Sequence, residues 1–196
     1  MNYPGCRPLS EEEVVRLIDA FTGRYRARDV ALVVLGSHTG FRISELLSIQ
    51  VNQIWTGTEV VKEVQVAKGF MKGKKMSRTM PLHEKAREAI WALLQSSRMW
   101  HPLFHEWPLF HAQGCQKRLS TRQAYDIIVN AAERAGLDTK RIGTHSLRKS
   151  FAKRLWTGRY VNMDPARMAR LLGHQNWSNT LRYLEFADEL NAAVLA

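Results

Sequence analysis

The chain has 196 residues, of which 45% are hydrophobic and 24% are charged, a composition typical of a folded globular protein and not of a disordered one. Lysine and arginine total 29 against 18 acidic residues, and the resulting net charge of +11 favours a polyanionic partner such as nucleic acid. The sequence has no membrane-spanning apolar run and no signal peptide, and its two cysteines, Cys6 and Cys115, exclude a disulfide framework.

The first half of the chain is predicted to form two helices and a small antiparallel sheet. Ser10 and Glu13 form a capping-box pattern, which predicts a helix through about Thr22. The apolar run 30–35 predicts a buried helix that ends near Gly40. Over residues 59–82, two valine- and methionine-bearing runs flank a turn rich in glycine and lysine, which predicts a β-hairpin.

The second half is predicted to be mostly helical. The stretch 99–115 has two prolines and no regular period, so we expect a packed connection there. Apolar spacing, Ser120 and Asp164 as caps, and Gly136 and Gly173 as helix ends predict the remaining helices. These helices cover about residues 86–94, 121–135, 145–156, 165–172 and 177–191. The expected fold class is α+β, mostly helical with one small antiparallel sheet.

Two short segments pair an arginine with a second polar residue three positions away. Arg42 and Glu45 in TGFRISEL would share one face of a helical turn, where the carboxylate could orient the guanidinium toward phosphate oxygens. Alone, that pair is more commonly an exposed ion pair. His145 and Arg148 in GTHSLR would project together from a helix start, which also favours anions. An exposed polar turn explains that pattern equally well.

Two further segments carry nucleophilic or basic side chains. LLGH ends at His174, and Tyr183 follows nine residues later, although a lone tyrosine on a helix usually belongs to the core. The predicted hairpin carries Lys68, Lys72 and Lys74, although a basic turn is usually only solvated. Each segment alone is therefore a weak indication of function.

Taken together, TGFRISEL, a lysine-bearing hairpin, HSLR, LLGH and the following tyrosine resemble the tyrosine recombinase, or phage integrase, family in order and spacing. The resemblance runs from about Ser10 to Tyr183 and implies a site-specific DNA recombinase with Tyr183 as nucleophile. Arg42 and Arg148 match the two arginines that clamp the scissile phosphate. His145 matches the histidine of the family's HxxR pattern.

The resemblance also assigns the remaining site residues. His174 matches the family's His/Trp position, and Glu45 matches an acidic position that orients the active site. Lys72 fits the hairpin lysine best, although the turn before Pro81 is one residue longer than the commonest family pattern. Lys74 is the second choice for this role and Lys68 the third.

The physical chemistry of these residues is consistent with cleavage that needs no metal ion, no ATP and no other cofactor. Two guanidiniums can stabilise the charge that develops on the equatorial oxygens of the phosphate. Nearby cations favour the phenolate of Tyr183, and a lysine can protonate the departing 5′-oxygen. The expected product is a 3′-phosphotyrosine, which conserves the energy of the broken bond for rejoining.

The resemblance further implies one catalytic domain over residues 1–196, without the N-terminal core-binding domain of larger members, as in the single-domain fimbrial-switch invertases. The expected partners are double-stranded DNA and further copies of the chain, as a tetramer on DNA and a monomer when free. We expect a cytoplasmic protein, encoded by a bacterium, phage or plasmid. Two alternatives are a type IB topoisomerase-like activity and a non-catalytic DNA-binding regulator.

Overall fold

The computed structural model describes residues 5–66, 77–112, 116–157 and 165–173. These residues form mainly helices and one sheet of two strands, which confirms the predicted α+β class. The helices are α1 (Glu11–Asp19), α2 (Arg26–Thr39), α3 (Ile43–Leu46), α4 (Glu84–Ser97), α5 (Thr121–Arg134), α6 (Thr144–Thr157) and α7 (Pro165–Leu172). Three 3-10 turns join them at Val51–Gln53, Pro102–Phe104 and Thr139–Arg141.

The helix ends follow the signals in the sequence. Ser10 accepts a hydrogen bond from the Glu13 amide, and the Glu13 side chain accepts one from the Ser10 amide, so the predicted capping box is confirmed. The helix it begins ends at Asp19, three residues earlier than predicted. Ser120 caps α5 in the same way with Gln123. Each reciprocal cap satisfies amides that have no partner within the helix.

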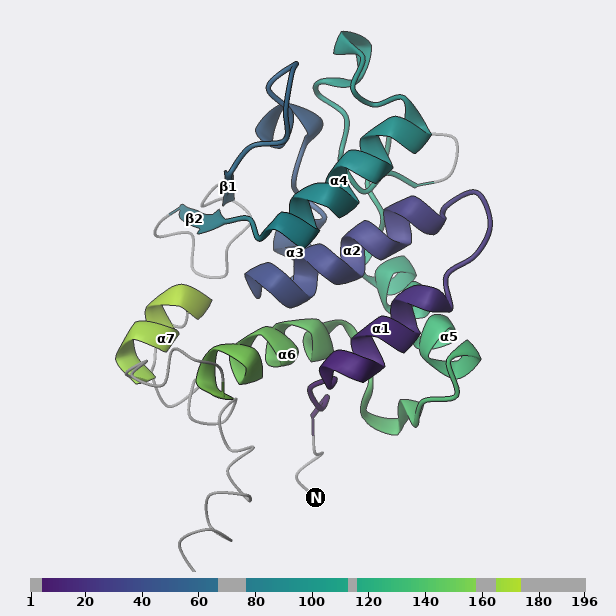
Figure 1. Cartoon of the computed structure of the whole chain (residues 1–196), viewed down its shortest axis with the longest axis vertical. Coiled ribbons are helices and arrows are strands. Elements are labelled where there is room, and N and C mark those ends of the chain that lie inside the picture. Colours follow the sequence, from purple (N-terminus) through teal and green to yellow (C-terminus); the bar gives the residue numbers. More distant parts are fainter. Residues whose placement is uncertain (1–4, 67–76, 113–115, 158–164, 174–196) are drawn as a thin grey trace, which may run out of the picture.

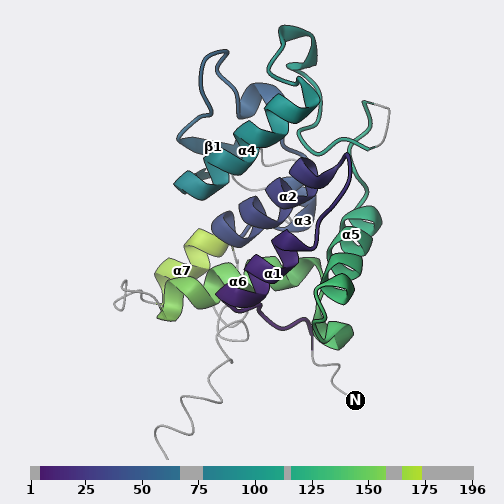
Figure 2. The same ribbon diagram turned by 45° about the vertical axis from the view of Figure 1, so that its right-hand side comes forward.

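Helix α2 is the central element of the fold. It lies between α4 on one side and α6 on the other, as Figure 1 shows. Its residues 31–35 are all buried, which confirms the buried helix predicted there. Helix α1 packs against α5 at another edge of the molecule, which the rotated view in Figure 2 brings forward. Because α2 contacts both neighbours, its end at Thr39 is held firmly beside α6.

The two strands of the sheet are β1 (Glu63–Val66) and β2 (Arg78–Pro81), and they pair antiparallel as predicted. Val64 lies opposite Met80, and Val66 lies opposite Arg78. Alternate residues of a strand point to opposite faces, and these four are the buried ones. The sheet therefore turns one charged side chain, Arg78, toward the core together with its apolar neighbours.

The connection after α4 is packed, as predicted, over the part that the structure describes. Leu109 and Phe110 are fully buried within the main hydrophobic core. The helix predicted over 177–191 lies outside the described residues. Among the described helices, none is long and apolar enough to cross a lipid bilayer.

Candidate active site

Arg42 is positioned by the tight junction between α2 and α3. Helix α2 ends at Thr39 and is capped by Gly40, whose φ of 61° lies in the left-handed region that favours glycine. The chain then extends through Arg42, the residue before the first turn of α3. The Arg42 amide donates to Glu45 Oε2 at 2.7 Å, and its Nη1 donates to Glu45 Oε1 at 2.8 Å. The carboxylate thus fixes both the backbone and the guanidinium of Arg42.

Glu45 is a fully buried carboxylate, with 0% of its side chain exposed. Besides Arg42 it accepts a hydrogen bond from Arg78 Nη2 at 3.1 Å. A buried charge is costly unless it is paired and hydrogen-bonded, and here two guanidiniums share it. The interpretation of Arg42 and Glu45 as an ordinary exposed ion pair is therefore wrong.

Arg148 projects from the first turns of α6 and is 1% exposed. Its Nη1 donates to the Gly40 carbonyl at 2.6 Å, and its Nη2 donates to the carbonyl of Leu172. Arg148 therefore joins the end of α2 to the end of α7. These two ends lie far apart in the sequence but meet at the start of α6.

The end of α7 is held by three arginines from three different elements. Nη1 of Arg78 donates to the carbonyl of Leu171 at 3.0 Å, and Nη2 of Arg42 donates to that of Gly173 at 3.4 Å. With the bond from Arg148 to Leu172, three consecutive carbonyls each receive a guanidinium. Terminal carbonyls lack partners within a helix and carry the negative end of its dipole, so cations suit this position.

His145 lies one turn before Arg148 on α6 and remains accessible to solvent. Partial burial of the ring is the largest cause that lowers the pKa of His145, and the charges of Arg148, Arg42 and Lys149 lower it further. The structure thus brings His145 into the field of both predicted phosphate-binding arginines. A neutral imidazole at neutral pH can accept a proton, which a cation cannot.

The cluster carries more positive than negative charge. It contains the guanidiniums of Arg42, Arg78 and Arg148 and the carboxylate of Glu45, which pairs with Arg42 and Arg78. Burial lowers the pKa of Arg78 to about 10; the charge of Glu45 opposes that shift, while those of Arg148 and Arg42 add to it. Like charges held this close repel one another, so a phosphate anion bound beside them would relieve the repulsion.

Five of the predicted site residues, or alternatives for them, lie outside the described residues. They are Lys68, Lys72, Lys74, His174 and Tyr183. The other four of the seven assigned residues are described: Arg42 and Arg148 donate to carbonyls at the end of α7, Glu45 holds Arg42, and His145 lies one turn from Arg148 on α6.

Sequence reasoning missed Arg78. Its signal was an arginine two residues before Met80, on the inward face of a strand whose alternate positions are otherwise apolar. An ionisable residue on a core-facing position is rarely buried without a partner, so it should have indicated a buried ion pair.

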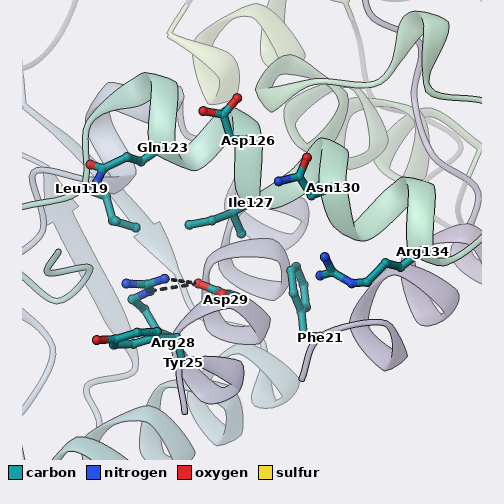
Figure 3. Close-up of a pocket in the computed structure, with 10 residues that line it drawn as sticks. All are labelled: Phe21, Tyr25, Arg28, Asp29, Leu119, Gln123, Asp126, Ile127, Asn130 and Arg134. Carbon is teal, nitrogen blue, oxygen red and sulfur yellow. Dashed lines mark hydrogen bonds and ion pairs between the residues drawn. The ribbon is translucent and has the colours of Figure 1, made fainter. Parts of the chain in front are cut away.

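A pocket lies elsewhere in the molecule, between α2 and α5. Figure 3 shows its lining, in which Arg28 forms an ion pair with Asp29. None of the predicted site residues lines this pocket. Within the described parts of the chain, no group of three histidine, cysteine or acidic side chains could hold a metal ion.

Comparison with known proteins identifies the class of protein that this fold and site define. The Phage integrase family matches residues 7–189. The chain therefore belongs to the phage integrase family, which confirms the resemblance found in the sequence.

Individual relatives agree with this assignment. Tyrosine recombinase XerC of Caldanaerobacter subterraneus is 30% identical over 187 residues, covering 95% of this chain and 49% of that protein. The probable integrase/recombinase YoeC of Bacillus subtilis is 27% identical, covering 95% of this chain and 93% of YoeC. The chain spans about half of the length of XerC and 59% of a XerD of Caulobacter vibrioides.

Solved structures share the fold. A post-cleavage complex of the XerH site-specific recombinase with its difH substrate aligns over 96% of this chain and 52% of XerH, with a TM-score of 0.73 at 23% identity. The XerA recombinase aligns over 91% of this chain and 60% of XerA, with a TM-score of 0.70 at 23% identity. At these identities the likeness concerns the fold.

Proposed function

We propose that the chain is the catalytic domain of a site-specific DNA recombinase, which cleaves and rejoins strands through a 3′-phosphotyrosine. The observation that carries this proposal is the cluster of Arg42, Arg148 and His145 around the end of α7. It supplies fixed positive charge and one proton acceptor, which transfer of a phosphodiester without a metal ion requires. Membership of the phage integrase family supports the same reaction.

In the proposed reaction, the Tyr183 oxygen attacks the scissile phosphorus. A bond forms between that oxygen and phosphorus, while the bond from phosphorus to the 5′-oxygen breaks. The tyrosine proton passes to His145 or His174, and Lys72 gives a proton to the departing 5′-oxygen, with Lys74 and Lys68 as the other candidates. Rejoining reverses these steps with the 5′-hydroxyl of another strand as the nucleophile, so no external energy source is needed.

Arg42 and Arg148 differ in their exposure to solvent and in their partners in the free protein. The Arg42 side chain is 21% exposed, and Glu45 already holds Arg42 through one guanidinium donor, Nη1, and the backbone amide. Arg148 is buried, with Nη1 and Nη2 on backbone carbonyls. We infer that Arg42 meets the phosphate directly and that Arg148 becomes accessible to it when DNA binds.

The proposed partner is double-stranded DNA, in the cytoplasm, with several copies of the chain assembled on one recombination site. XerH was solved bound to its difH substrate, and the Tn1549 transposon integrase was solved with circular intermediate DNA. The charge excess of this chain suits such a partner. The relatives are recombinases and integrases, so topoisomerase-like relaxation and non-catalytic regulation are not favoured.

The test uses nicked duplex oligonucleotides that tile the DNA on both sides of the coding sequence. Cleavage near the nick releases a short fragment, which traps the covalent complex. The full chain should form a protein–DNA adduct that resists denaturant on at least one duplex, and Tyr183→Phe should form none. An adduct of equal yield with Tyr183→Phe would show that another residue is the nucleophile. Complete absence of adducts on every duplex would refute the proposed activity.

A further inference from the structure

Arg78 is a third arginine of the site, and neither the sequence pattern nor the family resemblance assigned it a role. It begins β2 and is 8% exposed, so it faces the core and not the solvent. One guanidinium nitrogen, Nη2, donates to Glu45, and the other, Nη1, donates to the carbonyl of Leu171. Its guanidinium also lies over the ring of Phe41, 4.4 Å from the centroid. Glu45 belongs to the predicted site, Leu171 lies at the end of α7 that the site arginines hold, and Phe41 directly precedes Arg42.

These contacts link three parts of the site. Through Glu45, Arg78 supports the carboxylate that fixes Arg42. Through Leu171, it holds the end of α7, three residues before His174. It also lies on β2, which follows the segment 67–76 carrying the candidate lysines. A single planar guanidinium can hold two partners in fixed directions, which an ammonium cannot.

The energetics of Arg78 favour a role in positioning. Burial of a guanidinium is costly, and the nearby charges of Arg148 and Arg42 increase this cost. All three effects disfavour the charged form and lower the pKa of Arg78. Apolar residues such as Val66 and Met80 fill the neighbouring inward positions of the sheet. A hydrophobic side chain at position 78 would avoid the cost but would leave Glu45 with one guanidinium and the Leu171 carbonyl without its donor.

From these contacts we infer that Arg78 is a positioning residue for strand cleavage: it orients Arg42 through Glu45 and fixes the end of α7 through Leu171. Arg148 is bound only to backbone carbonyls through its terminal nitrogens, whereas Arg78 is bound to the buried carboxylate of Glu45. We therefore place the effect of Arg78 on the phosphate in its two supports, Arg42 and the end of α7. The inference deepens the proposed function and rests on it for its kinetic readout. The structural part concerns the free protein and can be tested without DNA.

Arg28 provides a matched control within the same chain. It is 7% exposed, its Nε donates to Asp29 at 2.8 Å, its Nη1 donates to the His111 carbonyl at 3.1 Å, and it lies over the Tyr25 ring (Figure 3). Arg28 therefore has the same kinds of partner as Arg78 but lies away from the site. Arg28→Gln reports the general cost of losing a buried arginine.

The kinetic experiment compares wild type, Arg78→Gln, Arg78→Lys and Arg28→Gln in adduct formation at saturating nicked DNA. We expect Arg78→Gln to slow this step about 100-fold, because small misplacements of a catalytic group cost about this much. Arg78→Lys should recover part of the rate, since it keeps a cation beside Glu45. Arg28→Gln should remain within about threefold of wild type. A rate for Arg78→Gln equal to that of Arg28→Gln would overturn the inference.

DNA binding separates a positioning role from direct phosphate contact. Each phosphate-bound cation adds about 0.9 to the slope of log K against log salt concentration. The slope should therefore fall by about 0.9 in Arg42→Gln and stay unchanged in Arg78→Gln. An equal fall in Arg78→Gln would mean that Arg78 itself contacts DNA, which would also overturn the inference.

A measurement on the free protein is independent of the proposed activity. The Nε–H resonance of Arg42 in a nitrogen-15 correlation spectrum should shift or broaden in Arg78→Gln and remain in place in Arg28→Gln. If the wild type forms no adduct with any DNA, the proposed function fails, while this spectrum still decides whether Arg78 orients Arg42. An unmoved Arg42 resonance in folded Arg78→Gln refutes the positioning role.

Discussion

Replacement of Gly40 by alanine would test how the end of α2 shapes the site. Gly40 has a φ of 61°, and its carbonyl accepts the hydrogen bond from Arg148 Nη1. A Cβ atom built on Gly40 would lie 2.3 Å from Cδ1 and 2.9 Å from Cε1 of Phe151, which is buried on α6. The ring of Phe151 must therefore move, and α6, which also carries Arg148, must accommodate it.

The expected cost has two parts. The left-handed conformation costs a residue with a Cβ atom about 1 kcal/mol, and overpacking of a buried site adds about 2 kcal/mol. We therefore expect Gly40→Ala to lower the free energy of unfolding by about 3 kcal/mol. Because the Gly40 carbonyl anchors Arg148, adduct formation should also slow about 10-fold or more.

Gly23→Ala separates backbone strain from the clash. Gly23 has a φ of 76°, but a Cβ atom there would meet nothing within 4 Å, so only the cost of about 1 kcal/mol applies. Urea denaturation measures the free energy of unfolding of both variants, provided that its dependence on urea concentration is the same as in wild type. Adding Phe151→Val to Gly40→Ala removes the clashing ring atoms, so the two effects should be less than additive. Equal losses for Gly23→Ala and Gly40→Ala would refute the reasoning.

Three further predictions concern charge and protonation. Arg148→Lys should retain the fold but lose at least about 100-fold in adduct formation, because one ammonium cannot reach both the Gly40 and the Leu172 carbonyls; a near-normal rate would contradict this. The imidazole of His145 should titrate below the ordinary histidine pKa in an NMR titration of the free protein, and Arg42→Gln should move its midpoint upward; an unmoved midpoint would exclude the coupling. Burial lowers the pKa of His38 to about 4, so between about pH 6.5 and 4 the unfolded chain binds the proton and the folded one does not. The difference between these two pKa values corresponds to about 3.4 kcal/mol, and solvent screening of the partly exposed ring reduces it to about 2 kcal/mol. The free energy of unfolding should therefore fall by about 2 kcal/mol as the pH drops through that window, and His38→Gln should flatten the dependence; a dependence as steep in the variant would assign it to another group.

The local elements could be predicted because their signals are local. The capping pattern of Ser10 and Glu13 fixes where α1 begins, since its two hydrogen bonds need only neighbouring residues. Gly40 marks the end of α2 because few other residues tolerate its backbone conformation. The antiparallel pairing of β1 and β2 follows from two short runs on either side of a turn.

The motif residues were also recognisable, but their surroundings were not. The spacing of Arg42 and Glu45 predicted that they pair, and they do. It did not predict that Glu45 is fully buried, that Arg78 shares it, or that Arg148 is covered in the free protein. Burial depends on which elements pack together, and Arg78 is 33 positions from Glu45 in the chain.

The sequence by itself determined the helices, the strand pair, the family resemblance and the residue types available for phosphate chemistry, because these depend on short-range patterns. Only the tertiary structure decided that α2, α6 and α7 meet, and that Arg78, Arg148 and Arg42 each donate to one of three consecutive carbonyls, Leu171, Leu172 and Gly173. Orphan carbonyls at a helix end can be satisfied by donors from anywhere in the chain. The packing of the helices around α2 selects these three arginines.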